Sequence, residues 1–377
     1  MSPEHSRTSR SVPSPVRLRV VICWTNISGY MAACWQALHA RPDIDLHVIA
    51  MAPGTTKQTA FDEALMGPVA HTFVTPDELH HNTEKIAAIV RNLRPDIIVV
   101  PGWVYPSYNA LPFQKGLTNV QVAMTMDTPF RGTLRQRFGR FRHPRLFPRI
   151  SRIVVPGERG TMLAKVLGFK PNHVVKGVYG VDFASRGPTY EARRKHPDGW
   201  PKQFLYMGRY AEEKCIDVLV DGYKAYRSTV KDPWPLVCMG KGEMASLLQN
   251  VPGITDLGFV QPGDQPKILA ESSLFVLASN YDPWPLVIVE SCAAGLPILC
   301  TEACGSAVEL VRPFFNGRII ATEDRAAMTE ALGWMHNHHA QLPEMGRRSR
   351  ELASAYTAEM WAERWVHMFN GMVNDAA

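Results

Sequence analysis

Residues 274–297 read LFVLASNYDPWPLVIVESCAAGLP, and this stretch decides the class of fold. Its first five residues form an apolar run of the length expected for a buried strand. A turn rich in proline follows, and residues 286–294 then have the composition of a helix. A second short apolar run, 297–300, begins two residues after Gly295. A strand, a helix and a strand in this order predict a parallel sheet covered by helices.

The same alternation of apolar runs and helical patterns extends along the rest of the chain. In the first half, the runs 18–24, 46–51 and 96–101 are rich in Val and Ile, as buried parallel strands are. In the second half, runs at 204–207 and 235–239 continue the pattern. A chain of 377 residues is too long for one ordinary core. We therefore predict an α/β protein with two Rossmann-like, doubly wound domains facing a central cleft.

Changes in composition give the predicted domain boundaries. Residues 1–17 are polar and lack the apolar centre of a signal peptide, so we expect a disordered leader. The N-terminal domain would span 18–186, and the Pro-rich, charged segment 187–200 would be a linker. The C-terminal domain would span 201–356. Residues 357–377 would form a helix that packs across the domain junction.

Composition also limits where the protein works. No apolar run approaches the ~18–20 residues that cross a bilayer. The seven cysteines are scattered and odd in number, as in a reducing compartment. We therefore expect a cytoplasmic protein. Residues 1–185 carry a net charge of +10 and residues 186–377 one of −4, so the first half should face an anionic partner.

Charged residues follow two of the predicted strands in the second half. Arg209 and Lys214 come after the run 204–207 and a glycine, and two cations beside a turn suit a diphosphate. Asp282 and Glu290 flank the start of helix 286–294, where free backbone N–H groups attract anions and carboxylates can accept hydrogen bonds from sugar hydroxyls. Taken singly, each residue is also explained as a surface charge or a turn former.

The order of these pieces resembles the C-terminal domain of retaining family-4 glycosyltransferases of GT-B fold. The resemblance covers roughly residues 200–320. Its motifs are Gly208-Arg209 with Glu213-Lys214, Gly240-Lys241-Gly242, Gly258-Phe259-Val260, Asp282-Pro283-Trp284 with Glu290 and Ala294-Gly295-Leu296-Pro297, and Asn316-Gly317. The resemblance implies transfer of a sugar from a nucleoside-diphosphate sugar to an acceptor hydroxyl, with retention. It also implies that no metal or other cofactor is needed.

The resemblance further implies roles for single residues. Arg209 and Lys214 would bind the donor diphosphate and stabilise the leaving group. Glu290 would bind the nucleotide ribose, and Asp282 would contact the transferred sugar. Asp127, on the acceptor side, completes the predicted catalytic set with Arg209, Lys214 and Asp282. The predicted donor-binding residues are Gly29, Gly208, Gly240, Phe259, Val260, Trp284, Leu286, Val287 and Glu290.

Some positions depart from the family pattern. Asp282 replaces the usual glutamate, Pro285 stands where a glycine is usual, and Met126 stands where many relatives have a histidine near the acceptor. Asp127 is the nearest substitute for that histidine. Two alternatives therefore stay open: a non-catalytic nucleotide-sugar-binding partner of an active transferase, or a GT-B-fold epimerase. No metal site is expected in the aspartates of Asp43-Ile44-Asp45 or in the histidine cluster 336–339.

Residues 131–152 form the most basic stretch, with eight arginines and no acidic residue. Leu134, Phe138 and Phe141 lie at helical spacing, so a helix here would have an apolar stripe edged by arginine. This composition is typical of a segment that lies on anionic lipid; a mobile basic loop is the alternative. No nucleic-acid partner is expected. We expect a glycan or lipid-linked acceptor, surface polysaccharide or glycolipid assembly, and a protein that is peripheral on the inner face of the membrane.

Overall fold

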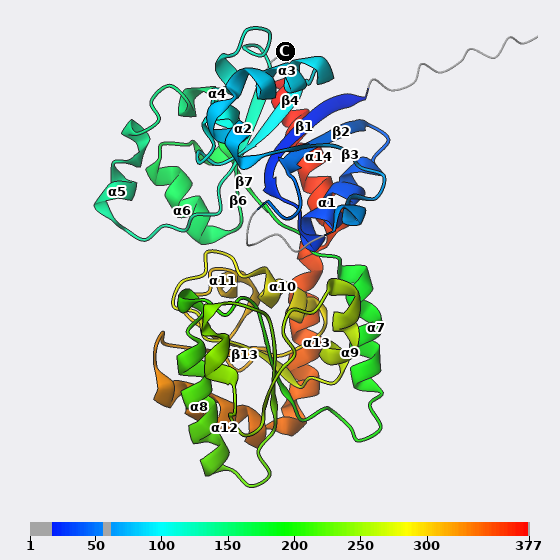
Figure 1. Ribbon diagram of the computed structural model, residues 1–377, viewed down its shortest axis with the longest axis vertical. Helices are drawn as coiled ribbons and strands as arrows, with labels where there is room; N and C mark the ends of the chain where they lie inside the picture. Colours follow the sequence, from blue (N-terminus) through cyan, green and yellow to red (C-terminus); the bar gives the residue numbers. More distant parts are fainter. Residues whose placement is uncertain (1–16, 56–61, 376–377) are drawn as a thin grey trace, which may run out of the picture.

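The computed structural model describes residues 17–55 and 62–375. Residues 1–16 of the predicted leader lie outside the described residues. Two α/β domains are stacked along the long axis of the molecule (Figure 1). The first sheet has seven strands in the order β3-β2-β1-β4-β5-β6-β7, and the second has six in the order β10-β9-β8-β11-β12-β13. Neighbouring strands are parallel in both sheets. The prediction of two Rossmann-like domains is confirmed.

The first domain contains the N-terminal elements. Its strands are β1 (Leu18–Asn26), β2 (Ile44–Met51), β3 (Ala70–Val74), β4 (Ile97–Pro101), β5 (Gln121–Thr125), β6 (Arg152–Val155) and β7 (Val174–Lys176). Its helices are α1 (Gly29–His39), α2 (Pro76–His81), α3 (Thr83–Leu93), α4 (Pro106–Ala110), α5 (Leu134–Arg137) and α6 (Glu158–Val166). The order of its strands reverses between β1 and β4.

The second domain repeats the plan. Its strands are β8 (Phe204–Met207), β9 (Leu236–Met239), β10 (Ile254–Asp256), β11 (Leu274–Leu277), β12 (Ile298–Thr301) and β13 (Gly317–Ile320). Its helices are α7 (Phe183–Arg194), α8 (Ile216–Thr229), α9 (Gln265–Ala270), α10 (Leu286–Ala293), α11 (Ala307–Leu310), α12 (Arg325–Asn337) and α13 (Leu342–Ala353). Here the order reverses between β8 and β11.

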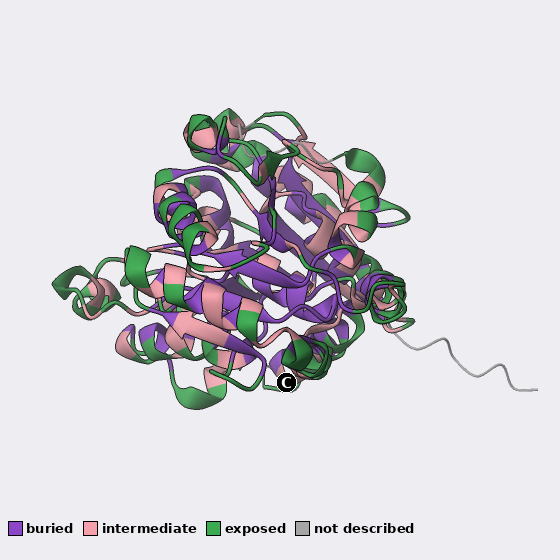
Figure 2. Ribbon diagram, turned by 90° about the horizontal axis from the view of Figure 1, so that it is seen from below, coloured by how far each residue is buried: buried purple, intermediate pink, exposed green. Residues whose placement is uncertain are grey.

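Buried residues fill both sheets and the helix faces turned toward them (Figure 2). In the first domain, one apolar cluster lies on each face of the sheet; Val20 and Ile22 belong to one, and Val21 and Cys23 to the other. Successive residues of β1 therefore enter opposite cores. A sheet covered on both faces needs apolar residues throughout each strand, which explains why the strands appear in the sequence as continuous runs.

Residues 187–200 differ from the linker predicted for them, because α7 continues as a helix to Arg194. Asp182 caps this helix by accepting a hydrogen bond from the backbone of Ser185 at 3.0 Å. Arg193 is fully buried and its guanidinium donates to backbone carbonyls at the ends of α9 and α10. The sequence conceals this helix, because Pro188 and the charged residues interrupt its apolar pattern while tertiary contacts stabilise it.

The last helix, α14 (Ala358–Asn374), returns to the first domain and packs against α1 (Figure 1). Trp361 and Trp365 are fully buried there, and their indole N–H groups donate to the carbonyls of Val178 and Gly177 at 2.8 and 2.9 Å. Two chain segments therefore cross between the domains, and they pair with each other: Val181 bonds with Tyr356 at 2.8 Å and with Ala358 at 3.0 Å.

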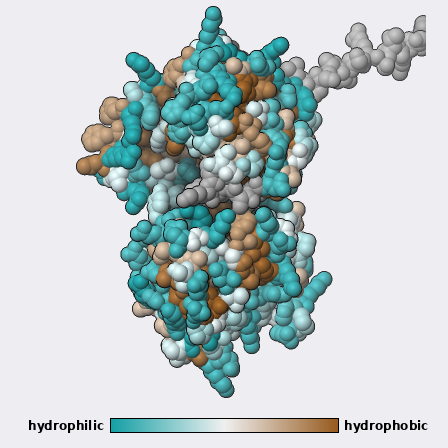
Figure 3. Space-filling model, viewed as in Figure 1, coloured by the Kyte–Doolittle hydropathy of each residue, from teal (hydrophilic) through white to brown (hydrophobic). Residues whose placement is uncertain are grey.

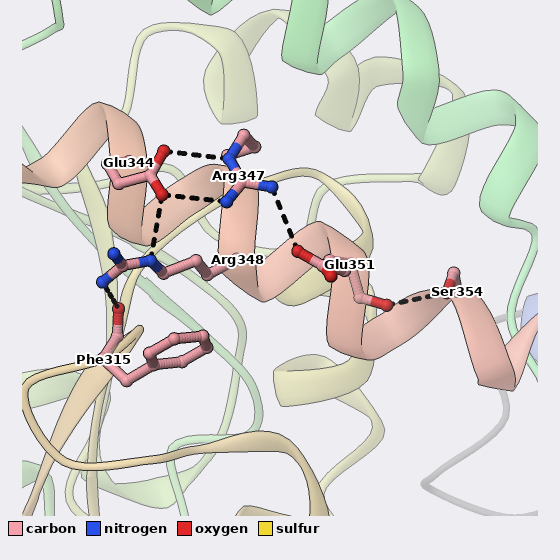
Figure 4. A network of polar contacts seen from close by, with 6 residues as sticks. All are labelled: Phe315, Glu344, Arg347, Arg348, Glu351 and Ser354. Atoms are coloured by element: carbon pink, nitrogen blue, oxygen red, sulfur yellow. Dashed lines mark hydrogen bonds and ion pairs between the residues drawn. The ribbon is translucent and has the colours of Figure 1, made fainter.

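The exposed face of α13 carries a network of ion pairs (Figure 4). Glu344 bonds with Arg347 at 2.8 Å and with Arg348 at 3.0 Å, and the neighbouring arginines lower the pKa of Glu344 to about 2. Arg348 also donates to the carbonyl of Phe315 at 3.1 Å. Exposed ion pairs contribute little stability, and within this network Arg348 links α13 to the loop before β13. In the described ranges, no helix is long and apolar enough to span a bilayer.

Candidate functional site

The carboxyl ends of the central strands in both sheets meet at the domain junction. Ser28, after β1, caps α1, and a Cβ on Gly29 would lie 3.8 Å from Pro262 of the second domain. The guanidinium of Arg131 in the first domain lies over the ring of Tyr281, 4.8 Å from its centre. Doubly wound proteins bind ligands where the strand order reverses, and of these residues Gly29 follows β1 and Tyr281 follows β11, strands that flank the reversal points.

Three of the predicted catalytic residues lie together at the reversal point of the second sheet. Lys214 lies 2.5 Å from Asp282, and both side chains are nearly buried. Arg209 pairs with Glu213 at 2.5 Å, but 54% of its side chain is exposed. The two cations therefore differ: the charge of Lys214 is neutralised within the protein, whereas Arg209 remains accessible to a ligand.

Burial determines the electrostatics of Asp282. Desolvation raises the pKa of its carboxyl, and the charge of Lys214 together with a hydrogen bond from that residue opposes the rise. The backbone of Trp284 also hydrogen bonds to Asp282, and the charge of Arg209 lowers its pKa further. Asp282 replaces a glutamate that is usual at this position, and its shorter side chain lies against Lys214.

Helix α10 presents an uncapped N-terminus beside this cluster. Pro285 is the residue before its first turn, and no side chain accepts a hydrogen bond from that turn. Leu286 and Val287, at its start, are half-buried. Such a terminus offers free N–H groups and the positive end of the helix dipole to an anion. The arrangement suits a phosphate group between α10 and Arg209.

Glu290 lies one turn further along α10, with 20% of its side chain exposed. Burial raises the pKa of its carboxyl, and Arg186 opposes this rise from 3.4 Å away. Arg186 is itself buried and also lies 3.4 Å from Gln265. The sequence did not indicate Arg186, because it belongs to the helix α7 that was not predicted.

The glycines after β8 and β9 are required by packing within the protein. Gly208 has a φ of 152°, and a Cβ on Gly240 would lie 1.9 Å from the carbonyl oxygen of Gly208. Phe259 is 40% exposed and lies near Lys241, whose ammonium is 5.2 Å from the ring centre. Val260 is half-buried. Gly240 is therefore explained by the neighbouring loop alone, whereas Phe259 presents an accessible ring.

The side chain of Trp284 packs between the two domains. It is only 8% exposed, and a Cβ on Gly157 of the first domain would lie 2.6 Å from its ring. Its ring centre also lies 6.2 Å from that of Tyr356. The indole that was predicted to bind the donor is thus packed against protein on these sides.

The first domain contributes Asp127, which follows β5. The hydroxyl of Tyr179 donates to its carboxylate at 3.4 Å, and the rings of Tyr30 and Trp24 pack edge-on against Tyr179. The carboxylate is exposed at the junction, yet the surrounding walls desolvate it and raise its pKa, to which the charge of Asp282 adds. Asp127 therefore lies close enough to Asp282 for the charge of one to act on the other across the junction.

Met126, Tyr30 and Tyr179 lie next to Asp127 or in the aromatic cluster beside it. Met126 is 3% exposed and belongs to the apolar core, so it is a packing residue. Tyr30 and Tyr179 were not predicted as site residues. Tyr179 directly precedes Gly180-Val181-Asp182, and no local pattern there indicates a contact with Asp127.

The histidines near the end of α12 have structural partners. His336 bonds with Tyr226 at 2.8 Å, His338 stacks on Trp334, and His339 bonds with the carbonyl of Trp200 at 2.8 Å. Within the described parts of the chain, no group of three or more His, Cys, Asp or Glu side chains lies close enough together to bind a metal.

Comparison with known proteins identifies the second domain. Residues 190–352 match the family model "Glycosyl transferases group 1". An uncharacterised glycosyltransferase of Haemophilus influenzae is 26% identical over 169 residues, which are 44% of this chain and 48% of that protein. The O-antigen chain mannosyltransferase B of Escherichia coli is 26% identical over 131 residues, 32% of this chain and 34% of that protein. The chain spans about half or less of the length of the curated relatives it matches.

Solved structures extend the similarity to both domains. A glycosyltransferase from Rickettsia africae has a TM-score of 0.72 at 14% identity, covering 95% of this chain and 99% of that one. Anabaena Alr3699/HepE, in complex with UDP and glucose, has a TM-score of 0.72 at 14% identity, covering 94% and 100%. The fold is thus GT-B, and the predicted resemblance to glycosyltransferases of this fold is confirmed, whereas family 4 and retention stay predictions.

Proposed function

We propose that the chain is a retaining, metal-independent glycosyltransferase that moves a sugar from a nucleoside-diphosphate sugar to an acceptor hydroxyl. The observation that carries this proposal is the cluster of Arg209, Lys214 and Asp282 at the reversal point of the second sheet, beside the uncapped N-terminus of α10. A doubly wound domain that ends in cations and free N–H groups suits a diphosphate.

Each part of the donor has a complementary group. The accessible guanidinium of Arg209 can exchange Glu213 for phosphate oxygens and stabilise the negative charge that develops on the leaving diphosphate. Lys214 positions Asp282 through its ion pair, and the carboxylate of Asp282 accepts hydrogen bonds from the sugar. The carboxylate of Glu290 accepts hydrogen bonds from the ribose hydroxyls.

Transfer then breaks the bond between the anomeric carbon and the diphosphate oxygen and forms a bond to the acceptor oxygen on the same face of the sugar. The acceptor proton passes to a phosphate oxygen of the leaving group. Asp127 lies opposite Asp282 and accepts a hydrogen bond from Tyr179, so it would orient the acceptor hydroxyl from the first domain. A polar group that the protein already holds in place contributes more to such a step than a group that must first reorganise.

Names of relatives suggest a setting. Matched proteins include the O-antigen chain mannosyltransferase B and an alpha-galactosylglucosyldiacylglycerol synthase of Streptococcus pneumoniae. We place the chain in surface polysaccharide or glycolipid assembly, at the cytoplasmic face of a membrane. UDP-sugars are the first donors to test, because Alr3699/HepE was solved with UDP and glucose.

The donor is identified by thermal shift with UDP-, GDP-, ADP- and TDP-sugars, since a ligand at ~100 times its Kd adds about 2.7 kcal/mol to the free energy of unfolding. With the donor found, Arg209→Ala should lower kcat/KM by roughly 10- to 100-fold, because a hydrogen bond to a charged group contributes about 1.5–3 kcal/mol. Arg347→Ala is the control, since Arg347 pairs with Glu344 on the exposed face of α13.

Undiminished turnover in Arg209→Ala would refute the diphosphate role. Purified protein that binds a nucleoside-diphosphate sugar but neither transfers nor hydrolyses it would favour the alternative of a non-catalytic binding partner. Interconversion of sugars without any acceptor would favour an epimerase.

A further inference from the structure

A pocket of about 390 Å³ lies between the arginine-rich segment, residues 131–152, and α6, at the edge of the domain junction. It is lined by Trp103, Thr128, Arg131, Thr133, Arg135, Gln136, Gly139, Arg142, His143, Phe147, Leu163, Leu167 and Tyr281. Thr128 follows Asp127 and Tyr281 precedes Asp282 in the sequence. The pocket therefore begins next to the residues that carry the two carboxylates of the candidate site.

One part of the pocket is apolar. Leu163 and Leu167 of α6 are buried, and Phe147 is half-buried beside them. The rings of Trp103, His143 and Phe147 contact one another, with centres 5.5 to 5.8 Å apart. The Nε2 atom of His143 is buried and has no hydrogen-bond partner among the described residues. A polar atom is thus left without a partner in an otherwise hydrophobic wall.

The rest of the pocket is positively charged. Arg131, Arg135 and Arg142 line it, and no acidic residue does so within the described ranges. Nor does any of the three form an ion pair with a described carboxylate, whereas Arg152, at the end of the same segment, pairs with Asp375. Three guanidinium groups beside an apolar wall attract a ligand that has an anionic group next to hydrocarbon.

The outer face of the segment is apolar and exposed. Leu134, Phe138 and Phe141 are 72%, 63% and 62% exposed, and hydrophobic atoms are visible at the tip of the segment (Figure 3). Helix α5 is short, so the stripe expected from one helix is shared with the 3-10 turn Gly139–Phe141. A Cβ on Gly139 would lie 2.7 Å from Leu167, so the segment packs closely on α6. Aromatic residues edged by arginine match the surface of an anionic bilayer.

We propose that this pocket is the acceptor site and that it takes a membrane lipid phosphate: a phosphate ester attached to a hydrocarbon chain. The exposed residues of the segment contact the bilayer, the arginines bind the phosphate, and Trp103, Phe147 and the leucines contact the first part of the chain. Bound in this way, the part of the acceptor beyond the phosphate reaches Asp127 and Asp282. This inference rests on the proposed function, because it names the acceptor of that reaction.

Binding is measured by calorimetry without any donor, so the result does not depend on sugar transfer. The probes are dihexanoyl phosphatidic acid below its micelle concentration, dihexanoyl phosphatidylcholine and inorganic phosphate. We expect phosphatidic acid to bind at least 10-fold more tightly than the other two. Equal binding of phosphatidic acid and inorganic phosphate would reduce the pocket to an ion site, and no binding of phosphatidic acid would also overturn the proposal.

Variants separate the pocket from general surface charge. The pair Arg135→Gln/Arg142→Gln should weaken binding of phosphatidic acid at least 10-fold. The matched pair Arg137→Gln/Arg145→Gln removes the same charge from the same segment, but neither residue lines the pocket, so binding should change less than 2-fold. Equal losses in both pairs would overturn the proposal. Unchanged nucleotide-sugar binding by the pocket pair would show that the donor site is intact, so the two proposals can fail separately.

The exposed face is tested with vesicles. Phe138→Ser/Phe141→Ser should lose binding to vesicles of phosphatidylcholine and phosphatidylglycerol while it still binds the soluble short-chain probe. Retained binding to these vesicles would contradict the bilayer contact assigned to this face.

Discussion

Arg193 provides a quantitative test of how the second domain is stabilised. Its guanidinium is completely buried and donates to the carbonyls of Ser272, Ala294 and Gly295 at 2.8, 2.6 and 3.1 Å, and also to that of Leu269. These carbonyls lie at or just beyond the C-terminal ends of α9 and α10, where a cation is favourable. One side chain therefore satisfies four acceptors and attaches α7 to both helices.

Replacement by methionine keeps a long apolar side chain but removes every donor. The carbonyl of Leu269 also accepts from the backbone N–H of Ser272, so three acceptors lose their donor. An unsatisfied buried acceptor costs about 1–3 kcal/mol, and three at the low end of that range give about 3 kcal/mol. We expect Arg193→Met to lower the free energy of unfolding by about this amount. The measurement is urea denaturation followed by tryptophan fluorescence, since Trp200 lies 5.3 Å from the guanidinium and reports on this region.

The neighbouring residue is the control. Arg194 is 56% exposed and pairs with Glu191, so Arg194→Met should change the free energy of unfolding by less than about 0.5 kcal/mol. Arg193→Lys retains a charge but offers fewer donors, and should fall between the two. A loss below about 1 kcal/mol in Arg193→Met, or one equal to that of the control, would refute the reasoning from unsatisfied carbonyls.

Three further outcomes follow from the site and the fold. Lys214→Met leaves a buried carboxylate unpaired at the donor site, so kcat/KM should fall by roughly 100-fold or more at neutral pH, which steady-state kinetics would show. Arg186 lowers the pKa of Glu290 against the effect of burial, so in Arg186→Met that carboxylate should protonate at higher pH. As the pH falls, calorimetric titrations should show nucleotide binding lost at a higher pH than in the parent protein. An unshifted pH profile would exclude an effect of Arg186 on the protonation of Glu290. Trp361→Ala should cost about 3–5 kcal/mol in thermal unfolding because the side chain is fully buried, whereas Met360→Ala, at an exposed position, should cost little.

The strands were the most predictable part of the fold. The runs 18–24, 96–101 and 204–207 coincide with β1, β4 and β8 to within a few residues, because strands covered on both faces must be apolar along their whole length. Helix α7 could not be predicted in the same way. Its stability comes from the buried contacts of Arg193 with residues 76 to 102 positions away, and no local periodicity reports such contacts.

The donor side of the candidate site was predictable for a related reason. Arg209, Lys214 and Asp282 directly follow β8 and β11, and adjacent parallel strands bring their carboxyl ends together. Their supporting residues were not predictable. Tyr179 reaches Asp127 across 52 positions, and Arg186 reaches Glu290 across 104, so only the folded chain shows these pairs. The catalytic and binding roles themselves stay predictions until the variants are measured.

The return of α14 to the first domain has a consequence for synthesis of the protein. A ribosome makes β1 to β7 first, yet the apolar face of α1 that packs against α14 stays uncovered until residues 358–374 emerge. All strands of the second domain are made in the interval. The second domain can therefore mature first, although it is translated later. A nascent chain halted before residue 358 would expose the apolar face of α1 that normally packs against α14. Exposed apolar surface of this kind is what chaperones bind.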